Sequence, residues 1–398
     1  MSVYSADEAA HRAGVTRDYI ESLIQLGLLK PDPSGMLSDG DARRAACIEA
    51  MNRAGVPREA LSAGVASGSV ALDFLDDPVY ERFAATSDET FAELAGRTGI
   101  AIEMLGIIRE SLGSPPPTPD DYVRESELAI VPYVDIASRA GYAPDAIESL
   151  LRVAGDSMRR IAETEGGLFY RDILSPALAR GLNTPDLETD DMRRLNNETD
   201  TSIVALYHGQ QAHAWLRNVV NGVGSLLANA GLHAASERQP AICFLDITGY
   251  TRLTQERGDA AAAKLAENLS RIVQRTSASH NGKPVKWLGD GVMVYFEDPG
   301  QAVAGALDMV AALREAGLPP GHVGIATGEV IFQQGDYYGQ TVNLAARIAD
   351  FARPGEVLVS AAVVEAAQGR GLSFTGLGPV ELKGVAEPID LATAARSV

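Results

Sequence analysis

The 398-residue chain has little cysteine and no long hydrophobic run. Its two cysteines, Cys47 and Cys243, are too few for a disulfide framework, which favours a reducing compartment. No stretch of about 18 uncharged apolar residues is present to cross a bilayer, and the first residues lack the basic and apolar regions of a secretory signal. We therefore expect a cytoplasmic protein with no membrane segment.

Basic residues are also scarce. The chain has 34 Lys and Arg against 53 Asp and Glu, a formal net charge of −19. Broad nucleic-acid binding depends on neutralising phosphates with Lys and Arg, so this balance argues against it. Apolar residues make up 46% of the chain, enough for sizeable cores, and its length favours two or three domains.

The first 77 residues have helix-turn-helix spacing. Short helices are expected over 6–14, 16–26 and 39–53, with Gly27 ending the second and a turn over 31–35. The Tyr4-Ser5 start and the Gly27–Pro31 end of the second helix resemble the N-terminal part of MerR-type winged-helix proteins. This resemblance implies a helix-turn-helix module.

DNA binding by this module is nevertheless the less favoured alternative. Residues 1–77 hold seven Lys and Arg and twelve Asp and Glu, so 7 − 12 gives −5. The expected recognition helix, 16–25, has one basic residue, and the expected wing, 31–39, has none. Because DNA readers of this type place basic side chains at both positions, we expect the module to pack or dimerise instead.

A second helical module follows, over 78–191. Residues 8–15 match residues 93–100 at an offset of 85, and residues 53–61 match residues 139–147 at an offset of 86. The two offsets agree, which predicts a tandem duplication; chance similarity between Ala- and Gly-rich helices is the alternative. A long helix over 192–230 is expected to form a coupling segment, 192–236.

The remaining residues, 237–398, change to a mixed pattern. Helices are expected over 259–277, 302–315 and 341–351, and strands over 241–246, 284–288, 292–296, 323–331 (broken by Gly328), 357–360, 374–382 and 389–392. The order βαββαβ with extra strands predicts a ferredoxin-like α/β sandwich. The whole chain is therefore expected to be an α+β protein whose first half is all-α.

Two aspartates follow apolar strands in this segment. Asp246 precedes the turn Ile247-Thr248-Gly249, whose free N–H groups could cradle phosphate oxygens, and Asp290 lies between two glycines at a hairpin tip. Alone, Asp246 could be a helix cap and Asp290 part of a type I′ turn. Together, two carboxylates can hold two divalent ions for in-line displacement at phosphorus.

Four further polar residues suit a nucleotide. Lys286 and Asp336 could donate to and accept from the edge of a purine base, although each could simply face solvent. Asn343 and Arg347 are four apart on an expected helix and so share one face. They could stabilise charge developing on a phosphoryl group, or form an exposed polar stripe.

These residues fall in motifs that resemble the class III nucleotidyl cyclase catalytic domain. The motifs are Phe244–Thr251, Lys286–Asp290, Asp336–Arg347, Arg353–Ser360 and Leu382–Gly384, in order and at fitting intervals. The resemblance implies that Asp246 and Asp290 bind two Mg²⁺ or Mn²⁺ ions and that Lys286 and Asp336 select adenine. It further implies that Asn343 and Arg347 position the ribose and stabilise the transition state, and that Lys383 contacts the terminal phosphates.

The resemblance also implies the reaction and the assembly. ATP is the expected substrate, and cyclic AMP and pyrophosphate are the expected products. Domains of this family form head-to-tail homodimers in which one subunit supplies the metal aspartates and the other supplies the remaining groups. The alternative function is a transcription regulator that senses nucleotides without turning them over.

Residues 86–230 resemble the helical regulatory domain of soluble actinobacterial adenylyl cyclases, which implies control of the C-terminal half. His208 and His213 lie on the expected long helix, after Glu198 and Asp200. Because histidine titrates near neutral pH, protonation of either could shift the contact between the halves. The alternatives are histidines with no regulatory role, or an apolar small-molecule effector between the helices.

Overall fold

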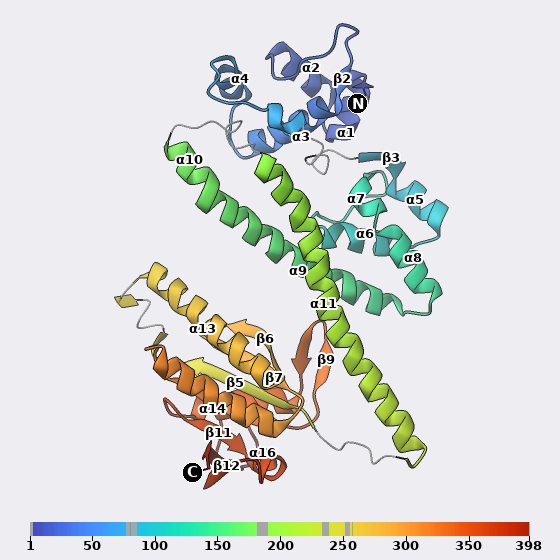
Figure 1. The fold of residues 1–398 in the computed structure, drawn as a ribbon. Coiled ribbons are helices and arrows are strands. Elements are labelled where there is room, and N and C mark those ends of the chain that lie inside the picture. Colours follow the sequence, from blue (N-terminus) through green and yellow to red (C-terminus); the bar gives the residue numbers. More distant parts are fainter. Residues whose placement is uncertain are drawn as a thin grey trace. The chain divides into compact units, whose positions relative to one another are not determined.

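The computed structural model describes residues 3–76, 80, 86–180, 190–232, 239–250, 255–256 and 258–397, with the backbone alone at positions 190, 193 and 197. The chain divides into two compact units, Met1–Val219 and Val220–Val398. Separate clusters of buried side chains form their cores. The helices of the first unit and the sheet of the second can be followed in Figure 1.

The first unit begins with a small helical module. Its elements are β1 (Val3–Tyr4), α1 (Ala6–Ala13), α2 (Arg17–Gln25), β2 (Leu37–Ser38), α3 (Asp39–Arg53), α4 (Arg58–Ala66) and a 3₁₀ turn, η1 (Asp73–Asp76). The Ser5 hydroxyl and the Glu8 carboxylate form a capping box at the start of α1, and Gly14, with φ of 66°, ends the helix. The helix therefore begins at the capping serine and ends at the glycine, as the sequence predicts.

The next run repeats the same order of elements. It contains β3 (Thr86–Thr90), α5 (Phe91–Thr98), α6 (Ile102–Ser111), β4 (Tyr122–Arg124), α7 (Glu125–Leu128) and α8 (Val131–Arg139). Thr90 and Glu93 form the capping box of α5, and Gly99, with φ of 71°, ends it. Each position lies 85 residues after its counterpart in α1, which is the arrangement that a tandem duplication would produce.

The two runs differ where α3 corresponds to α7 and α8. A single helix, α3, becomes two helices, and Pro132 lies in the first turn of the second one. Proline has no N–H to donate and disfavours the α conformation of the residue before it, so a helix tends to stop just ahead of it.

A buried acid occupies matching positions in both runs. Asp41 accepts a hydrogen bond from the Ser38 backbone N–H at 3.0 Å and pairs with Arg44 at 2.7 Å. Its counterpart Glu127 accepts from the Arg124 N–H at 2.7 Å and pairs with Arg109 at 2.6 Å. Each carboxylate caps a helix and neutralises an arginine, which satisfies two charges that would otherwise be costly to bury.

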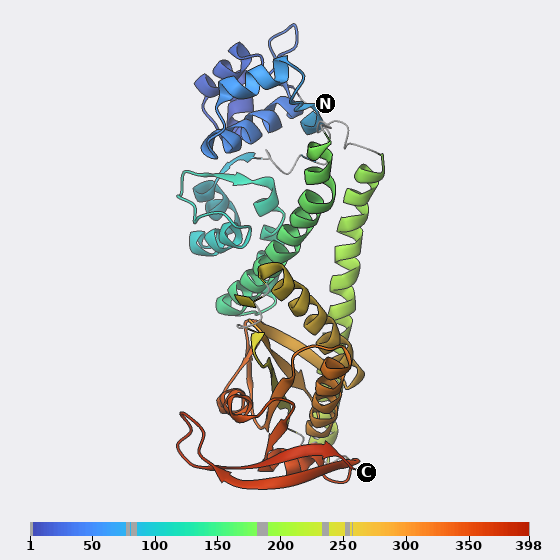
Figure 2. The same ribbon diagram turned by 90° about the vertical axis from the view of Figure 1, so that its left-hand side faces the viewer.

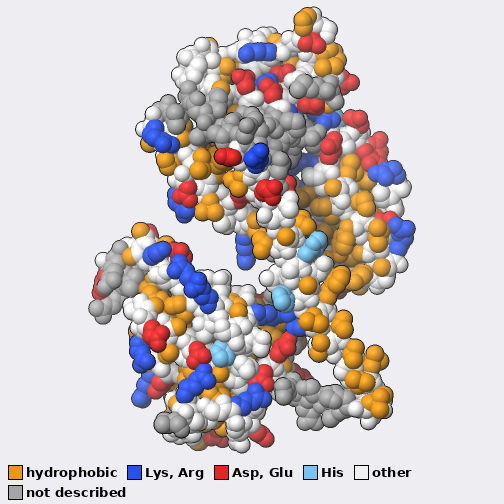
Figure 3. Space-filling view, viewed as in Figure 1, with side chains coloured by type: hydrophobic (Ala, Val, Ile, Leu, Met, Phe, Trp, Pro, Cys, Tyr) orange, Lys and Arg blue, Asp and Glu red, His pale blue; other side chains and the backbone are white. Residues whose placement is uncertain are grey.

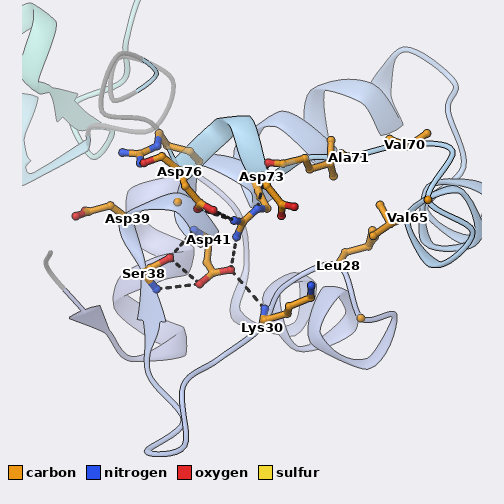
Figure 4. Close-up of a pocket in the computed structure, with 16 residues that line it drawn as sticks. Leu28, Lys30, Ser38, Asp39, Asp41, Val65, Val70, Ala71, Asp73 and Asp76 are labelled. Carbon is orange, nitrogen blue, oxygen red and sulfur yellow. Dashed lines mark hydrogen bonds and ion pairs between the residues drawn. The ribbon is translucent and has the colours of Figure 1, made fainter. Parts of the chain in front are cut away.

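A cavity of about 840 Å³ lies in the first module, between the end of α2 and the start of α3 (Figure 4). Two of its basic side chains are already engaged: Arg43 donates to the carbonyl oxygens of Leu75 and Asp76, and Arg44 pairs with Asp41 and Asp76. These guanidinium groups hold the module together and are not directed at a phosphate backbone.

Two long helices and, among the described residues between them, two short helical segments complete the first unit. They are α9 (Pro144–Phe169), a π-helical turn η3 (Tyr170–Leu174), α10 (Ser175–Ala179) and α11 (Asp190–Asn229), whose last ten residues belong to the second unit. Gly231, with φ of 70°, follows the end of α11. Within the described part of the chain, no helix combines the length and the apolar character that crossing a bilayer requires.

The second unit is built on a seven-stranded sheet. Its strands are β5 (Ala241–Ile247), β6 (Gly282–Leu288), β7 (Gly291–Phe296), β8 (Gly321–Thr327), β11 (Val357–Ser360), β12 (Leu372–Val380) and β13 (Ile389–Arg396), in the order β12-β13-β11-β8-β5-β7-β6. The core order β8-β5-β7-β6 is that of a ferredoxin-like βαββαβ sheet, as expected. Strands β12 and β13 extend it as a long antiparallel pair at one edge (Figure 2).

Helices cover both faces of this sheet. On one face, α13 (Asp259–Ser279), α14 (Pro299–Glu315) and α16 (Ala361–Ala367) pack on the odd-numbered residues of β5, such as Leu245. On the other face, α15 (Gln340–Phe351) packs around Ile242. A Cβ atom on Gly324 would lie 2.1 Å from the Ala349 backbone nitrogen, so glycine lets α15 approach β8 closely.

Three sequence expectations need correction here. The strand expected over 323–331 is two strands: β8 ends at Thr327, and β9 (Ile331–Gln333) pairs with β10 (Asp336–Tyr338) as a separate antiparallel hairpin. The glycines at 335 and 339 predict a turn around Asp336, which instead begins the short strand β10. Helix α16 was not anticipated, because its seven residues are too few to show a clear period.

Candidate active site

Asp246 lies near the end of β5, opposite Gly291 of β7 and His322 of β8. Side chains alternate along a strand, so Asp246 shares the face of Ile242 and Phe244, on the α15 side of the sheet. Its side chain is 45% exposed. The carboxylate is therefore partly covered by the sheet and still open to a ligand.

Asp290 occupies the two-residue loop between β6 and β7. Leu288 pairs with Gly291 across the hairpin, and Gly289 has φ of 71°. The φ angle of Asp290 is not positive. A type I′ turn needs positive φ at both loop residues, whereas a type II′ turn needs it at the first alone, so the loop has the II′ pattern and not the type I′ turn that was the alternative interpretation of Asp290.

The two aspartates interact electrostatically. Burial raises the pKa of Asp246, and the negative charge of Asp290 raises it further. Like charges at one site resist joint ionisation, and a bound cation removes that penalty. The sheet register explains the proximity, because Asp246 faces Gly291, the residue directly after Asp290.

His322 is a neighbour that the sequence reasoning missed. Its Nε2 lies 3.6 Å from Asp246 Oδ2, its Nδ1 lies 3.3 Å from the Thr248 hydroxyl, and the side chain is 14% exposed. Its charge acts to lower the pKa of Asp246, against the effects of burial and Asp290. Only the pairing of β5 with β8 brings together residues 76 positions apart, so nothing local in the sequence signals this contact.

The backbone after Asp246 is less free than expected. The Ile247 N–H bonds to the Asp246 carboxylate, and the Thr248 N–H donates to the Pro320 carbonyl oxygen at 3.1 Å. For the Gly249 N–H the structure shows no partner within the described stretch 239–250. The expected phosphate cradle over 247–249 is thus reduced, in this conformation, to Gly249. Thr251, in the same motif, lies outside the described residues.

Lys286 and Asp336 meet although 50 residues separate them. Lys286 Nζ lies 2.5 Å from Asp336 Oδ2, and the Tyr337 N–H donates to Asp336 Oδ1 at 2.7 Å. The lysine and aspartate side chains are 35% and 21% exposed, respectively. A hydrogen-bond donor and an acceptor therefore lie next to each other at the edge of the sheet. The edge of a purine base needs one partner of each kind.

Asn343 and Arg347 lie on one exposed face of α15, as their spacing predicts. Arg347 pairs with Asp350 on the same helix at 2.9 Å, and the Asp350 charge contributes to raising the Asp246 pKa. Among the described residues, no hydrogen bond or ion pair joins this face, the Lys286–Asp336 pair and the two aspartates. Lys383 is exposed in the turn between β12 and β13.

The donor set around Asp246 and Asp290 suits a hard divalent cation. Carboxylate oxygens are the ligands that Mg²⁺ and Mn²⁺ prefer. No group of three or more acidic, histidine or cysteine residues able to hold a metal ion occurs among the described residues.

His208 and His213 both lie exposed on α11. The His208 ring lies 5.7 Å from the Tyr207 ring, its neighbour on the same helix. The regulatory role of both histidines stays a prediction.

Comparison with known proteins agrees with this geometry. Residues 232–392 match the family "Adenylate and Guanylate cyclase catalytic domain". An adenylate cyclase of Streptomyces coelicolor is 28% identical over 215 residues, which cover 54% of each chain. An uncharacterized protein of Mycobacterium tuberculosis is 30% identical over 262 residues, covering 64% of this chain and 65% of that protein.

A solved structure, the adenylyl cyclase CyaB from P. aeruginosa, aligns with 40% of this chain and 95% of its own length, at 23% identity and a TM-score of 0.37. The chain spans about half the length of the Streptomyces relatives it matches. The similarity to the adenylate and guanylate cyclase catalytic domain family extends over residues 232–392 of this chain.

Proposed function

We propose that the chain is an adenylyl cyclase that converts ATP to 3′,5′-cyclic AMP and pyrophosphate in a homodimer. The observation that carries the proposal is the proximity of Asp246 to Asp290, which follows from the pairing of Asp246 with Gly291. Burial and the negative charge of Asp290 raise the pKa of Asp246. A site with this electrostatic character favours cations and the phosphates that accompany them. The curated relatives from two Streptomyces species, both named adenylate cyclase, support the choice of reaction.

Asp246 and Asp290 would hold two Mg²⁺ or Mn²⁺ ions against the triphosphate. When bound, such ions lower the pKa of the attacking 3′-hydroxyl and stabilise charge on the phosphorus oxygens. The protein contributes the placement: β5 and the β6–β7 turn bring Asp246 and Asp290 to the same end of the sheet. His322 contacts Asp246 and limits its freedom to rotate.

Lys286 and Asp336 would select the base. The ammonium can donate to a ring nitrogen of adenine, and the carboxylate can accept from its exocyclic amine. Adenine rather than guanine rests on the class III resemblance and on the names of the relatives. Asp336 already receives the Tyr337 N–H, so its orientation is fixed before the nucleotide binds.

Asn343 and Arg347 would act on the ribose and on the charge that develops at the α-phosphorus. Arg347 would exchange Asp350 for a phosphate oxygen, a substitution that a guanidinium accommodates well. The Gly249 N–H and Lys383 would contact phosphates. Once the 3′-oxygen has attacked, pyrophosphate leaves from the opposite side of the phosphorus.

A second copy of the chain would complete each site. The two aspartates and the Lys286–Asp336 pair form separate groups within one chain, and large apolar side chains beside them are exposed: Trp287 (39%), Leu288 (50%), Ile331 (63%) and Phe332 (61%). Exposed apolar surface of this kind marks protein interfaces. Covering it with a second cyclase domain would bring the separate groups together.

Helix α11 offers a further dimer surface. Leu216, Val219, Val223 and Leu226 repeat at spacings of three and four and are 63%, 60%, 49% and 70% exposed. This spacing is that of the apolar seam of a two-stranded coiled coil, and an identical helix would carry a matching seam. Hydrophobic side chains gather along the C-terminal half of α11 in Figure 3.

The helical first unit would regulate the cyclase domain and not read DNA. In the first module Arg17 pairs with Asp7 and Glu21, Arg44 with Asp41 and Asp76, and Arg53 with Glu49. Side chains engaged in this way are poorly placed to neutralise phosphates. A small-molecule or pH effector would act here, through α11.

One assay tests the proposed activity. Purified protein incubated with ATP and Mn²⁺ should release cyclic AMP and pyrophosphate in equal amounts, and GTP in place of ATP should give much less product. If the protein binds ATP but yields neither product, it is the nucleotide sensor and not the enzyme.

A further inference from the structure

The β9–β10 hairpin carries Asp336 but is not part of the seven-stranded sheet. It forms a two-stranded sheet of its own, with Asp336 opposite Gln333 and Tyr337 opposite Phe332. No backbone ladder among the described residues joins it to β6 or β7. The position of Asp336 relative to Lys286 therefore depends on side-chain contacts between the hairpin and β6–β7.

A bulge in β6 places two lysines on one face. Lys283 pairs with Tyr295 and Lys286 pairs with Met293, with a register shift between Pro284 and Lys286. Residues three apart on a regular strand point to opposite faces, and one extra residue reverses that relation. Both lysines therefore point toward the hairpin side, where Lys286 reaches Asp336.

Lys283 is surrounded by aromatic rings from both pieces of structure. Its Nζ lies 4.8 Å from the centroid of Tyr295 on β7, 5.1 Å from that of Tyr337 on β10 and 5.7 Å from that of Phe332 on β9. All three distances lie within the range of cation–π attraction. A single ammonium thus attracts rings on the main sheet and on the hairpin at once.

The rings also pack on one another. Tyr295 and Tyr337 stack with centroids 4.5 Å apart and planes inclined by 14°, and Phe332 lies 5.0 Å from Tyr337. Tyr337 is only 8% exposed, whereas its cross-strand partner Phe332 is 61% exposed. Tyr337 is also the residue directly after Asp336, so whatever fixes its ring fixes the base-selecting carboxylate.

We propose that Lys283 is a positioning residue for nucleotide selection: with Tyr295, Tyr337 and Phe332 it fastens the β9–β10 hairpin to β6–β7 and sets the place of Asp336. This inference rests on the proposed cyclase function. Lys283 itself touches no reacting group. Its effect passes through Tyr337 to Asp336, and from there to the purine.

The test compares Lys283→Met with Lys283→Arg. Methionine keeps the length and apolar stem without the charge, and arginine keeps a cation that stacks on aromatic rings. For Lys283→Met we expect the KM for ATP to rise about three- to ten-fold, with kcat changed less, and the preference for ATP over GTP to fall by a similar factor. In Lys283→Arg, both the KM for ATP and the preference for ATP over GTP should stay close to their wild-type values.

A matched control is Lys264→Met. Lys264 is 64% exposed on α13 and pairs with Glu267, so its loss removes a surface charge without touching the hairpin. Hydrogen exchange supplies a readout that does not depend on turnover: amides of residues 331–338 should exchange faster in Lys283→Met than in Lys264→Met.

Each outcome decides the inference. Unchanged nucleotide preference and unchanged exchange in Lys283→Met would refute it while leaving the cyclase activity of the wild type standing. If Lys283→Met does not fold, Phe332→Leu, at an exposed ring, should show the same direction of change at smaller size, and an unaltered Phe332→Leu would refute the proposal instead. Absence of product from the wild type would refute the proposed function, not the role of Lys283 in holding the hairpin, which exchange still reports.

Discussion

Lys286 Nζ and Asp336 Oδ2 lie 2.5 Å apart, so the two residues that would read the base neutralise each other before any nucleotide is bound. The base must therefore break or share this ion pair to enter. A site whose polar groups are left unpaired by the wrong ligand discriminates strongly, because each unpaired buried group carries a desolvation cost.

Replacing Asp336 with alanine should reduce this discrimination. In the proposed site the lost acceptor would face the exocyclic amine of adenine, so the ratio of kcat/KM for ATP to that for GTP should fall by about ten-fold or more. Steady-state assays with both nucleotides measure the ratio. Asp390→Ala, at an exposed position of β13, should leave it unchanged.

Loss of either metal carboxylate should remove activity without unfolding the protein. For Asp246→Asn and Asp290→Asn we expect kcat to fall about 100-fold or more, because in the proposed site each carboxylate would hold a cation that stabilises the transition state. Circular dichroism should show the same helix and strand content as the wild type. Full turnover by either variant would contradict the assignment of the site.

Two inactive variants should complement each other. In a mixture of Asp246→Ala and Arg347→Ala chains, about half of the dimers combine the two, and one of their two sites is intact. The mixture should therefore reach about a quarter of wild-type activity, whereas each variant alone stays inactive. Activity that never exceeds the sum of the separate variants would show that one chain supplies the whole site.

The exposed seam of α11 should control assembly. Leu216→Glu combined with Val223→Glu places charges at two seam positions and should shift the protein toward the monomer, with a matching loss of cyclase activity. Light scattering coupled to size-exclusion chromatography measures the mass. Asn221→Glu, on the opposite side of the same helix, is the control and should remain dimeric.

The buried pair of Arg109 and Glu127 predicts a large effect on stability. Glu127→Ala leaves Arg109, which is 8% exposed, with only the more distant carboxylate of Asp121 at 3.5 Å, and it removes the cap of α7, so it should lower the free energy of unfolding by about 3 kcal/mol. Removing the exposed partner of Arg152 with Glu148→Ala should cost at most about 0.5 kcal/mol. Urea unfolding of both variants gives the comparison.

Much of the fold follows from local signals in the sequence. Ser5, Thr90 and the glycines at 14 and 99 mark helix ends through capping and positive φ, which depend on neighbouring residues alone. After residue 240, short apolar runs alternate with helical patterns, and this local periodicity predicts the βαββαβ order. The split of α8 from α7 at Pro132 was open to the same reasoning and was missed.

The features of the site also fall into those that local sequence predicts and those that depend on the tertiary structure. The sequence by itself determined that Asp246 lies near the end of a strand and Asp290 at a hairpin tip, that Asn343 and Arg347 share a helix face, and that the segment resembles a cyclase domain. Only the tertiary structure decided that His322 lies against Asp246, that Lys286 pairs with Asp336, and that Lys283 is enclosed by three rings. Those contacts depend on strand register and on one bulge, and register is set by side chains that lie far apart in the chain.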